Sequence, residues 1–239
     1  MKPWIGTSGF QYAEWKGTFY PEDLPAAKML PFYAEHLATT EINYTFHRIP
    51  AAKTIDNWKH LTPETFRFAL KAPQKITHWS KLRDCADTLR YFYDVVSALD
   101  AKLGPVLFQL PPNFKKDTFI LGDFVNGLPG GMRAAFEFRH ESWFDDETFD
   151  LLREKDRALV VSDTDDKPLS EIISTAGWGY LRLRRTAYDE NDLADWMKRV
   201  KDQKWEDAFV FFKHEDEGIG PKLAAQFLKL SEPPAVAGG

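Results

Sequence analysis

Charged side chains at the ends of short apolar runs are the residues of this sequence best suited to chemistry. Three are carboxylates, Glu41, Glu137 and Asp163, a type that can give or take a proton once its neighbours adjust its pKa. The cations in equivalent positions are Lys71, Arg139, Arg182, Arg184 and Lys213. Arginine binds phosphate or carboxylate through two parallel hydrogen bonds. We therefore expect a pocket for a small anionic or phosphorylated substrate, in which the carboxylates act by acid–base and electrostatic catalysis.

Uncharged side chains beside these positions complete the expected site. Asn43, Gln109 and His140 are expected to orient the substrate by hydrogen bonds, and Trp143 is expected to contact it. Lys71 has a second expected use, because an amine whose pKa is lowered by neighbouring cations becomes a nucleophile. The chemistry would require no organic cofactor.

Apolar runs alternate with longer amphipathic stretches along the chain, which is typical of strands alternating with helices. Strands are expected at 4–8, 40–45, 66–71, 105–110, 134–139, 158–163, 179–183 and 208–213. Helices are expected at 28–38, 51–60, 82–102, 116–126, 145–155, 168–175, 189–202 and 218–230. Eight such units in 239 residues suit a closed (β/α)8 barrel, which takes about 250 residues. We predict a single α/β TIM-barrel domain over residues 1–232 and a flexible tail over 233–239.

Alternate positions within the expected strands differ in polarity. Successive side chains of a strand point to opposite faces. The apolar positions, expected to pack under the helices, include Ile42, Tyr44, Phe66, Phe68, Leu70, Val106, Phe108, Leu110, Phe136, Phe138, Leu181, Leu183, Val210 and Phe212. The opposite positions carry all the charged residues named above, Asp163 among them. These are expected to point into the barrel near the C-terminal strand ends, where TIM barrels build their active sites.

Internal salt bridges are the main alternative use of these charges. Burying an ion costs several kcal/mol unless it is paired, and Glu137 and Arg139 share one face of one strand. A paired polar core would then fill the barrel. The position at the C-terminal strand ends favours a ligand site.

Short motifs at consistent spacing run through nearly the whole chain. They are Gly6-Thr7-Ser8-Gly9, Trp15, Phe19-Tyr20-Pro21, Glu41-Ile42-Asn43, Thr45-Phe46, Thr62-Pro63, Lys71-Ala72-Pro73, Thr77-His78, Lys102-Leu103-Gly104-Pro105, Gln109-Leu110-Pro111-Pro112, Glu137-Phe138-Arg139-His140 and Ser142-Trp143. With this set the chain resembles the YecE-like family of TIM-barrel proteins, also called domain of unknown function seventy-two. The resemblance implies the barrel fold and leaves the reaction open.

Two late segments depart from the pattern of that family. The family pattern has Arg-x-His-Gly after the seventh strand, where this chain has Arg182-Leu183-Arg184-Arg185. It has an Asn pair after the eighth, where this chain has Lys213-His214. Both changes add positive charge, so a ligand shared by the family would be bound here in a variant form.

A divalent-metal-dependent phosphodiesterase is the alternative enzyme. The three carboxylates, with His140 and His214, offer the oxygen and nitrogen ligands that divalent ions take. The five cations at the same strand ends oppose a metal. His47 and His78 also follow strand ends and are expected to line the wall of the site.

Binding without catalysis is a further alternative. Aromatic residues crowd the first loop, including Phe10, Tyr12 and Trp15, and could stack the bases of a nucleotide or single-stranded nucleic acid. The loop over residues 213–221 contains Gly218 and Gly220 and could hold a phosphate. Its acidic residues 215–217 argue against that use.

The overall composition narrows the class of protein. Hydrophobic residues make up 44% and charged residues 28%, which is typical of a globular domain. A net charge of −5 argues against binding of duplex nucleic acid over the whole surface. The one cysteine, Cys85, and the absence of a signal-like or membrane-spanning segment predict a cytoplasmic location and no membrane partner. The oligomeric state is left open.

Overall fold

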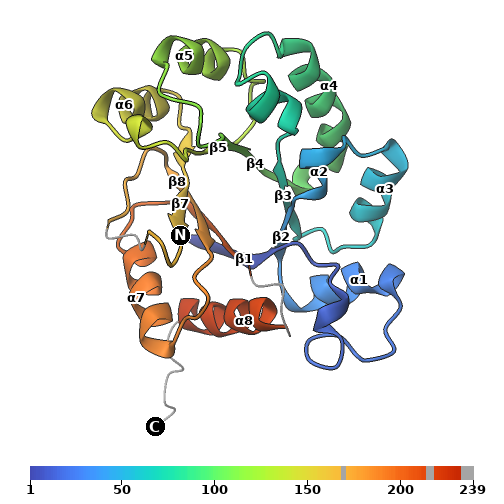
Figure 1. Ribbon diagram of the computed structural model, residues 1–239. Helices are drawn as coiled ribbons and strands as arrows, with labels where there is room; N and C mark the ends of the chain where they lie inside the picture. Colours follow the sequence, from blue (N-terminus) through green and yellow to red (C-terminus); the bar gives the residue numbers. More distant parts are fainter. Residues whose placement is uncertain (168–170, 214–217, 233–239) are drawn as a thin grey trace.

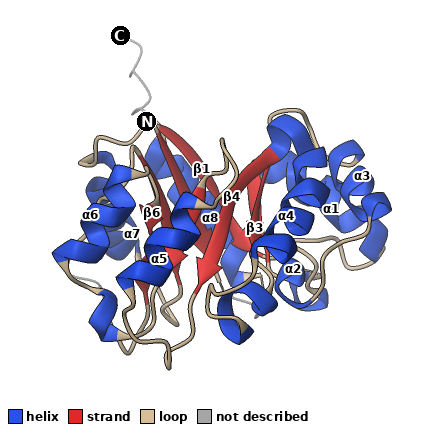
Figure 2. Cartoon of the chain, turned by 90° about the horizontal axis from the view of Figure 1, so that it is seen from above, coloured by secondary structure: helices blue, strands red, loops and turns tan. Residues whose placement is uncertain are grey.

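The strands of the computed structural model form a nearly closed barrel with helices on its outside (Figure 1, Figure 2). The structure describes residues 1–167, 171–213 and 218–232, and within these ranges it has nine strands, all paired in parallel, in the order β6-β5-β4-β3-β2-β1-β9-β8-β7. Each strand pairs with the next one in the chain, except that β6 and β7 lie at the two ends of this order, and β1 pairs with β9, as in a TIM barrel. The predicted fold class is confirmed.

The strands match the expected runs closely. Their bounds are β1 Lys2–Ser8, β2 Thr39–Ile42, β3 Arg67–Lys71, β4 Leu103–Gln109, β5 Ala134–Glu137, β6 Ala158–Leu159, β7 Val161–Asp163, β8 Trp178–Leu183 and β9 Asp207–Phe212. The described strands differ from the expected eight because the run 158–163 is divided at Val160. The Val160 N–H donates a hydrogen bond to the Phe136 carbonyl, so β6 and β7 together fill one position of the barrel.

The helices cover the outer face of the barrel (Figure 1). Their bounds are α1 Ala26–His36, α2 Tyr44–His47, α3 Ala52–His60, α4 Ala86–Val96, α5 Thr118–Asn126, α6 Asp146–Glu154, α7 Glu190–Lys201 and α8 Ile219–Ser231. Short 3-10 turns are η1 Ala13–Trp15, η3 Ser97–Lys102 and η4 Glu141–Trp143, and η2 Lys75–Trp79 is a π-helical turn. The α7 helix begins at a capping box in which Asp189 and Asp192 each accept from the other's backbone N–H, which satisfies donors that a helix start leaves unpaired.

Two expected elements are wrong in detail. The strand expected at 40–45 ends at Ile42 because α2 begins at Tyr44. Of the helix expected at 168–175, residues 171–175 are described and are not helical. There the Thr175 hydroxyl donates to the Arg157 carbonyl and accepts from the Leu159 N–H, which holds the segment against β6. The expected tail, 233–239, lies outside the described residues.

Two apolar layers support the barrel. The outer layer lies between strands and helices and includes Phe68, Phe108 and Phe136, all fully buried, as the strand pattern predicts. The inner layer fills the barrel itself with buried residues that include Trp4, Phe209, Phe211 and Tyr180. This inner layer lies beneath the buried charged residues Glu41, Glu137 and Arg182, which are found toward the C-terminal strand ends.

Tyr44 and Gly179 show how local structure modifies this pattern. Tyr44 was expected under the helices, but it lies on α2 and is 48% exposed. Gly179 on β8 leaves room for the Trp205 ring, because a Cβ there would lie 2.2 Å from a ring carbon. Among the described residues, no helix is both long enough and apolar enough to cross a bilayer.

Candidate functional site

Arg182 joins two buried carboxylates inside the barrel. Its Nη2 donates to Glu41 Oε1 at 2.9 Å, and its Nη1 donates to Glu137 Oε2 at 2.6 Å. Glu41 comes from β2, Glu137 from β5 and Arg182 from β8, and all three are at most 3% exposed. The guanidinium therefore links three strands that do not pair with one another.

The Glu41 carboxylate is fully engaged by donors. Ser8 Oγ donates to Oε1 at 2.8 Å, Tyr180 OH donates to Oε2 at 2.7 Å, and Asn43 Nδ2 lies 3.2 Å from Oε1. Burial alone would raise the pKa of Glu41, but Arg182 and the hydroxyls of Tyr180 and Ser8 outweigh it, so this pKa lies below its usual range. Glu41 is thus held as an anion.

Glu137 is held in the same charge state by three arginines. Arg184 Nη2 donates to Glu137 Oε1 at 3.1 Å, and Arg139 Nε lies 3.6 Å from the same oxygen. Burial alone would raise the pKa of Glu137, but the charges of Arg182, Arg184 and Arg139 lower it to about 2. A carboxylate this acidic is a weak base at neutral pH. The geometry therefore favours Glu41 and Glu137 as residues that position cations, whereas their expected catalytic role stays a prediction.

A pocket of about 250 Å³ lies above this cluster at the C-terminal strand ends. Seven of the expected site residues line it: Asn43, Lys71, Gln109, Arg139, Arg182, Arg184 and Lys213. His47, expected on the wall of the site, lines it as well, as do Tyr12 and Phe46. Phe46 was not expected there, because α2 and not a continuing strand carries it. The strand-end pattern thus locates the pocket, and the helical turn after β2 supplies the part that the pattern misses.

The pocket and the cluster beneath it carry an excess of positive charge. Among the described residues, the pocket lining contains five cations, whereas the cluster beneath it contains two carboxylates, Glu41 and Glu137. Burial lowers the pKa of Arg184; Glu137 offsets this effect, while Arg182 and Arg139 add to it. The Nε atom of Arg184 is buried, and no described residue accepts a hydrogen bond from it. Buried donors are rarely left unpaired in proteins, so an anion would be favourable beside it.

Lys71 has an environment of its own in this pocket. Its Nζ donates to Gln109 Oε1 at 2.9 Å and lies 4.0 Å from the centroid of the Phe46 ring. Burial, followed by the charge of Arg182, lowers the pKa of Lys71 to about 8, although Glu41 and Glu137 pull it upward. The Lys71 amine therefore changes charge near pH 8.

Asp163 does not join the cluster, contrary to the predicted strand pattern. On β7 the inward position belongs to Ser162, whose hydroxyl accepts from Arg184. Asp163 points outward, where its Oδ2 accepts from Arg185 Nε at 2.9 Å, Tyr188 OH at 2.9 Å and Trp196 Nε1 at 3.2 Å. The prediction failed because the run 158–163 is apolar on both faces at its start, so its pattern does not distinguish inside from outside.

His140 and Trp143 also lie away from the pocket lining. The His140 ring caps the turn η4 by accepting from the Ser142 N–H. Trp143 is fully buried, donates from Nε1 to the Phe114 carbonyl at 2.7 Å, and stacks on Phe138. Trp143 thus packs within the loop after β5, and the expected substrate contacts of both residues stay predictions.

The described structure offers little support for the expected metal ligands or for the expected phosphate-binding loop. No three His, Cys, Asp or Glu side chains gather in a way that could hold a metal ion within 1–167, 171–213 and 218–232. His214 and the acidic residues 215–217 lie outside those ranges.

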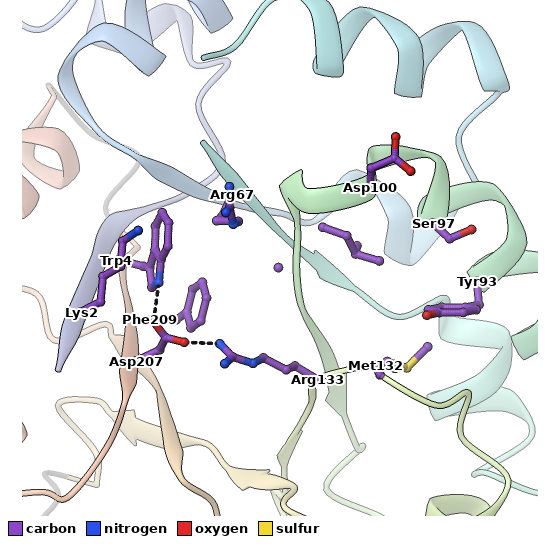
Figure 3. Close-up of a pocket in the computed structure, with 13 residues that line it drawn as sticks. Lys2, Trp4, Arg67, Tyr93, Ser97, Asp100, Met132, Arg133, Asp207 and Phe209 are labelled. Carbon is purple, nitrogen blue, oxygen red and sulfur yellow. Dashed lines mark hydrogen bonds and ion pairs between the residues drawn. The ribbon is translucent and has the colours of Figure 1, made fainter. Parts of the chain in front are cut away.

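A larger cavity, of about 510 Å³, lies at the opposite, N-terminal end of the barrel (Figure 3). Asp207 accepts there from Trp4 Nε1 and Arg133 Nη1. Arg67 donates to two backbone carbonyls, and Lys2 lies 4.1 Å from the centroid of the Trp4 ring. Because these polar groups are paired within the wall, and because this end of a TIM barrel serves stability, the candidate site is the smaller pocket.

The fold and the position of the charged pocket define the class of protein, an α/β barrel whose polar side chains gather at the C-terminal strand ends. The chain belongs to the DUF72 family: a family model described as "Protein of unknown function DUF72" matches residues 4–236. This confirms the resemblance drawn from the motifs.

Named relatives and solved structures agree with this assignment. The chain is 26% identical to the UPF0759 protein YunF of Bacillus subtilis over 89% of this chain and 90% of that protein. It is 33% identical to the UPF0759 protein YecE of Escherichia coli K12 over 47% of this chain and 42% of that protein. A DUF72 protein of Thermotoga maritima superposes with a TM-score of 0.86 at 26% identity, covering 98% of this chain and all of that one. A DUF72 protein of Enterococcus faecalis has a TM-score of 0.80 at 20% identity, over 96% and 95% of the two chains, and shares the fold.

Proposed function

We propose that the pocket at the C-terminal strand ends binds a small anion and that the protein is an enzyme acting on it. The observation that carries the proposal is the excess of cations around the pocket, in a chain whose net charge is −5. A cationic pocket attracts and orients an anion. Arginine also suits phosphate and carboxylate, since its fork binds both oxygens at once.

The roles of the residues follow from their contacts. Arg139 and Arg184 would contact the anion, because Arg139 is the more exposed of the two and Arg184 has a buried donor without a described acceptor. Glu41 and Glu137 would hold Arg182 and Arg184 in place. Lys71 and His47 are the groups of the lining suited to proton transfer.

The size of the pocket limits the ligand. A volume of about 250 Å³ is smaller than the pockets that bind drug-sized molecules, which run from about 300 to 1,000 Å³. The expected ligand is therefore a phosphorylated or carboxylated molecule of a few carbon atoms. The proposal includes the cytoplasmic location expected from the sequence and requires no cofactor.

Thermal unfolding with a ligand panel tests the proposal. The panel contains sugar phosphates, nucleotides, carboxylic acids and short oligonucleotides, each with added Mg²⁺ or with EDTA. A ligand at a hundred times its Kd stabilises the folded state by about 2.7 kcal/mol, which at this length raises Tm by about 5–11 °C. We expect a rise with one class of small anion that is the same with Mg²⁺ and with EDTA.

Two variants make the test specific to the pocket. Arg139→Gln removes a cation whose pairing distance to Glu137 is 3.6 Å and whose side chain is 40% exposed, so the fold should survive while the ligand-induced rise shrinks. Arg90→Gln, on the exposed face of α4, is the matched control and should leave the rise unchanged. A rise that requires Mg²⁺ would favour the metal-dependent phosphodiesterase, and a rise with oligonucleotides alone would favour nucleic-acid binding. If the ligand raises the Tm of both variants equally, the anion binds outside this pocket.

A further inference from the structure

The Lys71 amine is placed where a carbonyl compound could reach it. Lys71 ends β3 and lines the pocket. Gln109 Oε1 accepts one of its hydrogen bonds, and the Phe46 ring covers another side of the ammonium. Within the described residues no carboxylate forms a direct ion pair with Lys71, since Glu41 and Glu137 are engaged by arginines. Such an amine is easily deprotonated and is not blocked by a salt bridge.

The charge state of this amine favours nucleophilic attack. An ordinary lysine has a pKa of 10.5, whereas burial and Arg182 lower the pKa of Lys71 to about 8. At pH 7 this difference gives about 300 times more neutral amine than an ordinary lysine has. Lysines that form imines in enzymes are activated by burial in an apolar pocket or by a neighbouring positive charge.

We propose that Lys71 forms an imine with the carbonyl group of a small anionic aldehyde or ketone, such as a 2-oxo acid or an aldehyde phosphate. The inference rests on the proposed function, because the same cations that bind the anion would place its carbonyl beside Lys71. Arg139 and Arg182 influence the charge of Lys71 and line the same pocket. A small ligand whose carbonyl lies within a few bonds of its anionic group would fit a pocket of about 250 Å³. Its anionic group would contact the arginines while its carbonyl faces Lys71.

The reaction balances without any further reagent. The Lys71 nitrogen lone pair forms a bond to the carbonyl carbon, and the carbonyl oxygen takes the proton that the nitrogen loses. The resulting hydroxyl then takes a second proton and leaves as water while the nitrogen lone pair forms the C=N bond. His47 lines the pocket and can exchange these protons. Glu41 and Glu137 are ionised and do not supply them.

Reductive trapping tests the imine directly. The protein is incubated at pH 7 with glyoxylate and sodium cyanoborohydride, which transfers a hydride to the C=N carbon and fixes the adduct as a secondary amine. Peptide mass spectrometry then measures the modified fraction of each lysine. We expect Lys71 to be modified at least tenfold faster than Lys75, an exposed lysine four residues away. Glycolaldehyde, which has no charge, should react with Lys71 more slowly than glyoxylate.

Variants and the rise in Tm separate the two proposals. Lys71→Arg keeps the positive charge but forms no imine, so the adduct should vanish at this position, while Lys75→Arg should leave it unchanged. Trapping in the wild-type chain stands by itself if the Lys71 variant does not fold. Modification of Lys71 at the rate of exposed lysines would overturn the imine. If the anion-induced rise in Tm is present without that modification, only this inference fails; if both are absent, the proposed function fails too. Equal rates with glyoxylate and glycolaldehyde would overturn the assignment to anionic carbonyl compounds.

Discussion

Replacing Arg182 by methionine tests whether the charged cluster holds the barrel together. Arg182 is 3% exposed and joins Glu41 to Glu137, so its removal leaves two buried carboxylates without their shared partner. Breaking a buried ion pair in this way costs about 3–5 kcal/mol. For a chain of this length that lowers Tm by about 6–20 °C. The assay is thermal unfolding at pH 7 of the wild type, Arg182→Met and Arg90→Met, the last being the control on the exposed face of α4.

The pH dependence of the same variant identifies the cause of the loss. The pKa of Glu137 is about 2 in the folded protein and 4.5 in its ordinary state, which corresponds to about 3 kcal/mol of stability. Because this pKa is lowered by folding, the contribution is complete above pH 4.5 and is lost as the pH falls toward 2. The difference in stability between wild type and Arg182→Met should therefore shrink between pH 7 and pH 3. A loss below about 1 kcal/mol, or one that is equal at both pH values, would refute the reasoning.

Three further predictions follow from the described contacts. Asp163→Ala should lower the free energy of unfolding by about 2 kcal/mol in urea titrations, because it leaves buried donors unpaired. The anion-induced rise in Tm should stay the same, and a smaller rise would show that Asp163 contributes to the anion site. Gly179→Ala should cost about 1–3 kcal/mol by the same method, because its methyl group would overlap Trp205, and an unchanged stability would contradict this packing. Binding of sulfate, measured by titration calorimetry, should weaken as the pH rises through about 8, because Lys71 loses its proton there. This weakening should disappear in Lys71→Arg. The same weakening in that variant would exclude Lys71 as its cause.

The alternation of polar and apolar residues was sufficient to predict the fold and most of the pocket. It worked for β2, β4, β5 and β8, because each has an apolar outer face and a polar residue on the inner one, so that Glu41, Gln109, Glu137 and Arg182 could be assigned to the barrel interior. The same rule failed for Asp163, because the run 158–163 is apolar on both faces at its start and is divided at Val160. A period of two residues carries information only where the two faces of a strand differ.

The contacts of the loops could not be predicted from strand patterns at all. Phe46 reaches Lys71 because the chain turns into α2 directly after Asn43. Trp143 does not line the pocket, because its indole N–H donates a hydrogen bond to the Phe114 carbonyl, 29 residues earlier in the chain. Such pairings depend on where two loops meet in space, and the local sequence around one residue does not indicate which distant residue it will contact.

The link through Arg182 also restricts how this protein can change during evolution. Because one guanidinium pairs with carboxylates on β2 and β5, loss of Arg182 takes a partner from two buried carboxylates, and loss of either carboxylate takes a partner from the buried guanidinium. The three positions can therefore change only as a group, or by way of a less stable intermediate. A relative with a neutral residue at the position of Arg182 is expected to have neutral residues at those of Glu41 and Glu137 as well. The barrel can thus vary its ligand more readily through the surrounding loops and through Arg139, which is 40% exposed and contacts Glu137 at 3.6 Å.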